Sequence, residues 1–190
     1  YKADVVVRIT GDCPLVDPDL VDEVIRQFKA ENVDYFCNIN PPTYPDGLDV
    51  EVFTFSALEI SDREADSDFD REHVTTYLRN NKQFSKACMS NPEDLSHLRW
   101  TVDEPEDLQV VTRIFEFFSP NILFSWQQVL ELQQKKPNLF RGNQQLKRNE
   151  GAVMRSGQKL YKRAKQIIPG GNMLLSKRPE MFLPDQWPAY

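Results

Sequence analysis

Two aspartates follow apolar segments of the sequence at positions where ligands often bind. Asp12 lies in Gly11-Asp12-Cys13-Pro14, directly after the apolar run of residues 4–10, and Asp103 follows the run of residues 98–102. In open α/β sheets, ligands bind beyond the carboxyl ends of the strands. Two carboxylates at such ends suit Mg²⁺, which takes oxygen ligands and is usually shared with substrate phosphates. Either aspartate alone is typical of a turn or a helix N-cap, so the metal hypothesis depends on the pair.

A second pair of carboxylates lies in residues 48–53, where polar and apolar side chains alternate. The alternation places Asp49, Glu51 and Phe53 on one face of a predicted strand, with successive side chains about 6.6 Å apart. Two carboxylates beside an aromatic ring can bind the vicinal hydroxyls of a sugar. A solvated outer face of a strand would show the same pattern, and both interpretations stay open.

Three basic side chains could bind an anionic substrate. Arg71 and His73 are predicted to lie in the first turn of a helix, where backbone N–H groups point outward and anions bind. Arg99 lies on the predicted strand of residues 98–102. Each of the three could equally serve a structural role. The sequence contains no GxSxG, HExxH, Walker A or GxGxxG motif, which excludes the common serine-hydrolase, zincin, P-loop and dinucleotide-binding classes.

The elements that must position these residues alternate between strands and helices. Strands are predicted at residues 4–10, 33–38, 48–53, 86–89 and 98–102. Helices are predicted to begin at Asp17-Pro18, near Ser56 with Glu59 at capping-box spacing, near residue 70, at Pro105 and after Ser125. The first strand is a nearly continuous apolar run, which is typical of a strand buried on both faces. This alternation predicts an α/β layered sheet.

Composition indicates a globular protein rather than a disordered or membrane-spanning one. Of the 190 residues, 40% are hydrophobic and 27% are charged, and no apolar run approaches the ~18 residues that span a bilayer. The first residues lack a secretion signal, so we expect a cytoplasmic location and no membrane contact. Cys13, Cys37 and Cys88 are widely spaced without a CxxC pair, which predicts free packing thiols rather than disulfides or a zinc site.

The charge of the chain changes sign near Arg141. Residues 1–140 hold 13 Lys and Arg against 26 Asp and Glu, whereas residues 141–178 hold 10 against 1. This change predicts a boundary between modules, with residues 141–156 as a flexible linker. The basic stretch contains one aromatic residue, Tyr161, so we expect a solvated linker and helix face rather than a nucleic-acid site.

Four motifs together resemble a known family. In order along the chain they are RITGDCPLVDP, YPDGLDVEVF, REHVTTY and DLSHLRWTVDEPEDLQVV. They resemble the cytidylyltransferase-like proteins of surface and spore-coat polysaccharide synthesis over residues 1–120. The resemblance implies a Rossmann-like α/β/α nucleotidyltransferase domain, often dimeric. It also implies that Asp12 and Asp103 are the catalytic metal ligands, and that positions on the sugar side include Asp49, Glu51, Arg71, His73 and Arg99.

The glycine- and arginine-rich loop with which this family binds the nucleotide is not found in the sequence. We therefore expect residues 1–120 to form the second half of the domain, incomplete at its N-terminus and inactive alone. Residues 121–155 are expected to form a closing helix and a linker. Residues 156–190 resemble the start of a class III, pyridoxal-phosphate-dependent aminotransferase of the glutamate-1-semialdehyde aminomutase type. They are too few to include a cofactor pocket, so this chain is not expected to bind pyridoxal phosphate.

The resemblances imply Mg²⁺-dependent nucleotidyl transfer in a protein fused to an aminotransferase. In that reaction a sugar hydroxyl attacks the α-phosphate of CTP and pyrophosphate leaves, so the partners are a nucleoside triphosphate and a sugar. One alternative is a glycosyltransferase that uses the same carboxylates to bind a nucleotide sugar. The other is a catalytically silent scaffold or dimerisation module that serves the aminotransferase.

Overall fold

The computed structural model describes residues 3–146 and residue 148, and the part of the chain through Gln145 forms one compact unit. The elements alternate as the sequence predicts. In chain order they are β1 (Val5–Arg8), α1 (Pro18–Glu31), β2 (Tyr35–Cys37), β3 (Glu51–Thr54), α2 (Phe55–Glu64), α3 (Asp68–His73), α4 (Thr76–Asn80), β4 (Lys86–Cys88), α5 (Pro105–Phe118), α6 (Trp126–Lys135) and the 3-10 helix η1 (Pro137–Phe140). The predicted linker beyond residue 148 and the predicted aminotransferase segment lie outside the described residues.

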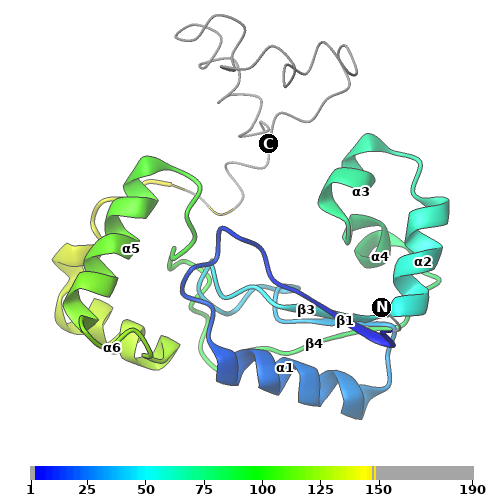
Figure 1. Cartoon of the computed structure of the whole chain (residues 1–190), viewed down its shortest axis with the longest axis horizontal. Coiled ribbons are helices and arrows are strands. Elements are labelled where there is room, and N and C mark those ends of the chain that lie inside the picture. The colour runs from blue at the N-terminus through cyan, green and yellow to red at the C-terminus, as the bar shows by residue number, and fades with distance from the viewer. Residues whose placement is uncertain (1–2, 147, 149–190) are drawn as a thin grey trace, which may run out of the picture. The chain divides into compact units, whose positions relative to one another are not determined.

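The strands form a single mixed sheet in the order β1-β3-β2-β4. Figure 1 shows α1 running along one side of this sheet. β3 is antiparallel to both β1 and β2, and β2 is parallel to β4, so β1, β2 and β4 run in the same direction. The prediction that the first strand is buried on both faces is wrong in this structure. Among the described strands β1 pairs only with β3, and Val7 is 38% exposed because it lies at the edge of the sheet.

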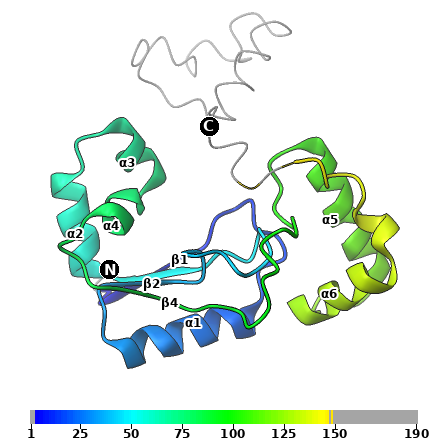
Figure 2. The ribbon, with the colours of Figure 1, turned by 180° about the vertical axis from the view of Figure 1, so that it is seen from behind.

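Helices cover both faces of this sheet, which confirms the α/β prediction. α1 packs against β2 and β3 on one face, where Val50 and Val52 point into the larger core. On the other face, Tyr35 and Phe53 pack against Ala57 of α2 and Leu78 of α4. Figure 2 shows the group α2–α4 at one end of the sheet and the pair α5 and α6 at the other.

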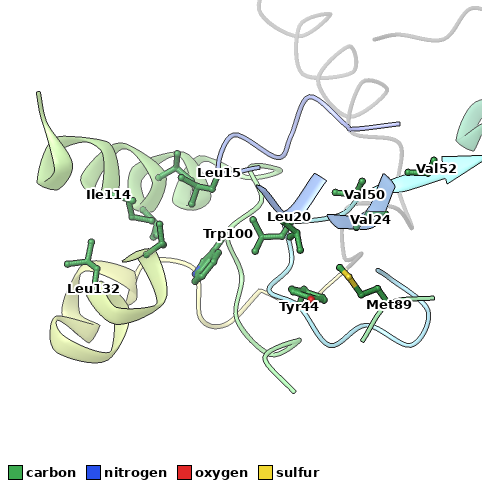
Figure 3. Close-up of a cluster of buried hydrophobic side chains, with 14 of the residues drawn as sticks. Leu15, Leu20, Val24, Tyr44, Val50, Val52, Met89, Trp100, Ile114 and Leu132 are labelled. Carbon is green, nitrogen blue, oxygen red and sulfur yellow. The ribbon is translucent and has the colours of Figure 1, made fainter. Parts of the chain in front are cut away.

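The larger core joins the sheet and α1 to α5 and α6. Trp100 is fully buried and lies at the centre of this core, and its indole N–H donates to Gln133 at 2.7 Å. Ile114 and Leu132 lie on one side of Trp100, and Leu20 lies on the other (Figure 3). Trp100 therefore fixes residues 99–103, which include two of the candidate site residues, against the rest of the domain.

Local capping explains where most helices begin. As predicted, Asp17 caps α1, accepting from the backbone N–H of Leu20 at 3.0 Å, and Ser125 caps α6. Ser125 also forms a capping box with Gln128. The N-cap of α2 lies two residues earlier than expected: it is Thr54 rather than Ser56, because the Thr54 hydroxyl accepts from the N–H of Ala57. Among the described residues, none of the helices is long and apolar enough to cross a membrane.

Three predicted elements differ in the structure. Residues 98–102 are extended but form no strand, and they are held by an isolated bridge between Arg99 and Asp46. The helix predicted near residue 70 is split into α3 and α4 because Val74 has a left-handed φ of 59°. The predicted linker does not begin at residue 141, since Asn143 is 2% exposed and hydrogen-bonded within the domain.

Candidate functional site

The carboxyl ends of β1, β2 and β4 meet at one edge of the sheet, and β3 begins at the same edge. The loop that contains Asp12 leaves β1 there, and Asp49 lies two residues before the start of β3. The extended segment of residues 99–103 bonds to Asp12 and to Asp46, three residues before Asp49. The structure therefore places Asp12, Asp49 and Asp103 in segments at the end of the sheet where α/β proteins bind ligands.

Backbone hydrogen bonds connect the loop of Asp12 with the segment that ends in Asp103. The carbonyl oxygen of Asp12 accepts from the N–H of Val102 at 2.8 Å and from the hydroxyl of Thr101 at 3.0 Å. Because Asp103 follows Val102 directly, its position is fixed relative to Asp12. The structure thus brings together the two predicted metal ligands, which are 91 residues apart in the sequence.

Arg99 holds the carboxylate of Asp103 and joins it to the core. The Arg99 side chain is only 6% exposed, and its Nη2 donates to Asp103 Oδ2 at 2.9 Å and to Asp107 Oδ2 at 2.7 Å. Its Nη1 donates to Asp46 Oδ2 at 3.3 Å. The sequence predicts Arg99 on the sugar side of the site, whereas the structure surrounds its guanidinium with three carboxylates. Charge-assisted bonds of this kind fix geometry strongly because both partners are ionised.

Asp107 is the most deeply buried member of this cluster, and the sequence analysis missed it. Its Oδ1 accepts from Arg99 Nε at 2.9 Å and from Asn143 Nδ2 at 2.7 Å. Its Oδ2 also accepts from the N–H groups of Asp103 at 3.1 Å and Glu104 at 3.0 Å. Burial would raise the pKa of the Asp107 carboxyl, but the hydrogen bonds from Arg99, Asn143 and the backbone hold it below its usual value of 3.8.

The turn of residues 45–48 brings Asp46 against the same segment. Leu48 N–H donates to the carbonyl of Pro45 at 3.2 Å, and Trp100 N–H donates to the carbonyl of Asp46 at 2.7 Å. Gly47 has a φ of 109°, and a Cβ atom there would lie 2.6 Å from the backbone of Trp100 and Thr101. The close approach therefore requires glycine at position 47. By contrast, a Cβ atom at Gly11 would meet nothing within 4 Å.

Glu51 lies in a buried polar cluster rather than on a solvated face. Only 2% of Glu51 is exposed, and its carboxylate accepts from Arg8 and from the Tyr35 hydroxyl. Arg79 lies 3.9 Å away, measured from Nε to Glu51 Oε1. The solvated-strand alternative is therefore wrong for Glu51. Arg8, Tyr35 and Arg79 were not predicted to take part, because nothing in their local sequence indicates this contact.

Asp49 lies near the loop that contains Asp12 and Cys13. It is half-buried, and its charge, like that of Asp12, reinforces the effect of burial in raising the pKa of the Cys13 thiol to about 12. Asp49 is therefore within electrostatic reach of the loop that contains Asp12. The Asn38 side chain fixes this segment, since it donates to the carbonyl of Leu48 at 2.7 Å and accepts from the N–H of Val50 at 2.9 Å.

Arg71 and His73 lie in the last turn of α3, not in the first turn of a helix as predicted. The argument that helix N-terminal amides attract an anion to them therefore does not hold. Arg71 instead donates to the carbonyl oxygens of Asp62 at 3.0 Å and Ala65 at 3.1 Å, at the C-terminal end of α2. The His73 ring packs on Phe69 with 4.3 Å between ring centroids. Both residues thus make contacts within the helical group α2–α4.

The donor set at Asp12 and Asp103 fits a hard cation of the magnesium type. Asp12 is half-buried, and the Asp103 side chain is 28% exposed, with one of its oxygens held by Arg99. Among the described residues no group of three or more His, Cys, Asp and Glu side chains converges as a metal site. Two carboxylates are nevertheless sufficient for Mg²⁺, which keeps several waters and shares substrate phosphates.

Comparison with known proteins identifies the family. A family model described as cytidylyltransferase matches residues 1–144 of the chain. The chain belongs to the cytidylyltransferase family. A solved structure of a cytidylyltransferase from Leptospira borgpetersenii superposes on it with a TM-score of 0.70 and 30% sequence identity, over 74% of this chain and 60% of that one.

Two curated relatives are similar to this cytidylyltransferase-family chain. It is 34% identical over 142 residues to an uncharacterized protein of Methanocaldococcus jannaschii, covering 73% of this chain and 57% of the relative. It is 33% identical over 119 residues to the spore coat polysaccharide biosynthesis protein SpsF of Bacillus subtilis, covering 60% of this chain and 48% of SpsF. The chain thus spans about half the length of these relatives.

The family match extends beyond the 120 residues predicted from the motifs and includes Asn143. In this cytidylyltransferase-family domain, Asn143 donates to the buried Asp107 at 2.7 Å and to the carbonyl of Arg99 at 3.3 Å. Asn143 lies in a polar stretch 36 residues after Asp107, and nothing in the neighbouring sequence indicates that it bonds to Asp107.

Proposed function

We propose that this chain contributes the metal-binding and sugar-binding parts of a Mg²⁺-dependent cytidylyltransferase. The reaction joins CTP to a sugar and releases pyrophosphate, and it supplies CMP-sugar for surface polysaccharide synthesis. The observation that supports it best is the hydrogen-bonded connection between the Asp12 loop and residues 101–103 in a chain of this family. The name of the SpsF relative supports polysaccharide synthesis as the setting.

Asp12 and Asp103 would hold the cation. Bound there, Mg²⁺ would neutralise charge on the phosphates of CTP while the CMP group is transferred to the sugar hydroxyl. Arg99 and Asp107 keep the Asp103 carboxylate in place and restrict its rotation before substrate arrives. Pre-organisation of this kind lowers the barrier because the site does not have to reorganise during the reaction.

Asp49 and Glu51 would lie on the sugar side. Asp49 is half-buried and lies at the same sheet edge as Asp12, so its oxygens can accept hydrogen bonds from sugar hydroxyls. Glu51 contacts Arg8, Tyr35 and Arg79, and this cluster would orient the basic groups toward the substrate. We keep Arg71 and His73 as candidate contacts of the sugar from the helical group α2–α4.

Metal binding by the isolated chain tests these roles without relying on turnover. Electron paramagnetic resonance of free Mn²⁺, used in place of Mg²⁺, measures binding to the 190-residue chain. We expect Asp12→Asn and Asp103→Asn each to weaken Mn²⁺ binding by about tenfold or more, since each removes a charged ligand. Glu106→Gln is the matched control, because this exposed carboxylate lies close to Asp103 in the sequence. Equal binding by all four proteins would contradict the assignment.

The tail and the assembly of the protein complete the proposal. We propose that residues 156–190 begin a class III aminotransferase domain, that the protein is a homodimer and that it is cytoplasmic. The three cysteines are free thiols, as is usual in a reducing compartment. The complete open reading frame should encode the rest of an aminotransferase, and its product should bind pyridoxal phosphate, detected by absorbance. Sedimentation equilibrium of that product tests the dimer.

A further inference from the structure

Two of the three cysteines face each other across neighbouring strands. Cys37 ends β2, Cys88 ends β4, and the two residues are paired in the parallel register of these strands. Both side chains lie on the sheet face that packs against α2 and α4, with their Sγ atoms 3.8 Å apart. The sequence analysis predicts three separate packing thiols, and the register of β2 and β4 brings two of them together.

The backbone geometry at this pair permits a disulfide. Neighbouring strands lie about 4.8 Å apart, within the range of roughly 4.4–6.8 Å that Cα atoms of a disulfide span. The sulfur atoms would have to approach from 3.8 Å to about 2.05 Å, which requires side-chain rotation and a small approach of the two strand ends.

The two thiols differ in reactivity in a way that suits sequential oxidation. Cys37 is only 1% exposed, whereas Cys88 is half-buried and accessible to a small oxidant. The Cys37 thiol donates to the Cys88 sulfur, and this hydrogen bond lowers the pKa of Cys88 below that of an ordinary thiol. The same contact, together with burial, raises the pKa of Cys37. Cys88 is therefore the more nucleophilic thiol, and Cys37 lies in position to react with it next.

We propose that hydrogen peroxide converts Cys37 and Cys88 into a reversible disulfide that joins β2 to β4. The Cys88 thiolate attacks one peroxide oxygen, the O–O bond breaks, and the departing hydroxide takes a proton to become water. The Cys37 sulfur then attacks the Cys88 sulfenic acid, the S–O bond breaks, and the hydroxyl leaves with the Cys37 proton as a second water. The two thiols supply the two electrons that reduce the peroxide. A dithiol reductant restores both thiols by exchange.

The disulfide would form next to the candidate site. Cys37 is paired on its other side with Glu51 of β3, and Asn38, which holds the segment around Asp49, follows directly. Oxidation would therefore fix the end of the sheet that positions the carboxylates of Asp49 and Glu51. The two thiols would react in the same way whatever reaction the chain catalyses.

Peptide mapping of the oxidised chain tests the proposal. The reduced 190-residue chain is treated with hydrogen peroxide at low protein concentration, alkylated with N-ethylmaleimide in denaturant and digested without reduction. We expect a peptide pair linked through Cys37 and Cys88, an alkylated Cys13, and full recovery of thiols after dithiothreitol. Cys13→Ser, the matched control, should form the same link.

Single variants separate the two steps. Cys37→Ser, or Cys37→Ala if the serine variant does not fold, should stop at a Cys88 sulfenic acid that dimedone traps. Cys88→Ser should leave Cys37 reduced. The proposal is overturned if Cys37 and Cys88 are both recovered alkylated after peroxide, or if Cys88 is over-oxidised while Cys37 stays a free thiol. It is also overturned if the chain forms only intermolecular disulfides.

Discussion

Replacement of Asp107 by asparagine tests whether the buried cluster around Arg99 holds the domain and its candidate metal ligand in place. Asp107 is fully buried and accepts five hydrogen bonds, two of them from Arg99. Asparagine has the same shape but only one acceptor oxygen. In its best orientation the oxygen replaces Oδ2, and the new NH₂ group faces two donors, Arg99 Nε and Asn143 Nδ2.

The expected cost follows from what Arg99 retains. Removal of one partner from a buried ion pair typically costs about 3–5 kcal/mol. Arg99 keeps Asp103 at 2.9 Å and Asp46 at 3.3 Å, so we expect the lower end of that range. For a domain of this size, a loss of about 3 kcal/mol in the free energy of unfolding lowers Tm by roughly 6–12 °C.

Urea denaturation followed by tryptophan fluorescence measures this loss, because Trp100 is fully buried, directly follows Arg99 and donates its backbone N–H to the carbonyl of Asp46. Glu106→Gln is the matched control: it removes an exposed carboxylate from the same helical turn, and its stability should stay within about 0.5 kcal/mol of wild type. If Asp107→Asn is as stable as Glu106→Gln, the cluster does not hold the domain as argued.

Three further predictions test separate parts of the structure. Gly47→Ala should destabilise the domain by more than about 2 kcal/mol in the same urea assay, since φ at Gly47 is 109° and the new Cβ would meet the backbone of Trp100. Gly11→Ala, where the new Cβ meets open space, should cost under about 1 kcal/mol, and equal costs for the two variants would contradict the close approach at Gly47. Folding lowers the pKa of the Asp107 carboxyl, so the stability that this carboxylate contributes is present above pH 3.8 and is lost as the pH falls further. The difference in free energy of unfolding between wild type and Asp107→Asn should therefore shrink in acid. A difference that stays constant with pH would refute the lowered pKa. Because the thiolate is the reactive form, alkylation of Cys88 by iodoacetamide should rise at a lower pH than that of an ordinary thiol. Cys13, whose pKa is raised to about 12, should react far more slowly at neutral pH, and equal rates for the two thiols would contradict these environments.

The helices of the larger core could be predicted from sequence because their signals are local. Asp17-Pro18, Pro105 and Ser125 mark the starts of α1, α5 and α6 within a few residues, and apolar spacing marks the buried faces. The division of the helix near residue 70 could not be predicted, since nothing in the local sequence indicates the positive φ of Val74.

The candidate site could be predicted only in part. Asp12 and Asp103 are recognisable because each follows an extended segment and lies in a family motif. The role of Asp107 was hidden, because an acidic residue in the first turn of a helix is typical of capping and does not reveal a buried charge. Partners such as Asn143 and Cys88 are found 36 and 51 residues from Asp107 and Cys37, and only the folded arrangement brings them together.

Product analysis tests the central claim most directly. The protein encoded by the complete open reading frame is incubated with CTP, Mg²⁺ and a panel of sugars, and ³¹P NMR follows the phosphates. We predict formation of CMP-sugar and pyrophosphate with at least one sugar, and a loss of roughly a hundredfold or more in rate for Asp12→Asn and Asp103→Asn, with Glu106→Gln unchanged. No CMP-sugar with any sugar of the panel, release of CMP or CDP from a nucleotide sugar supplied in place of CTP and sugar, or full activity of both aspartate variants would contradict the proposed reaction.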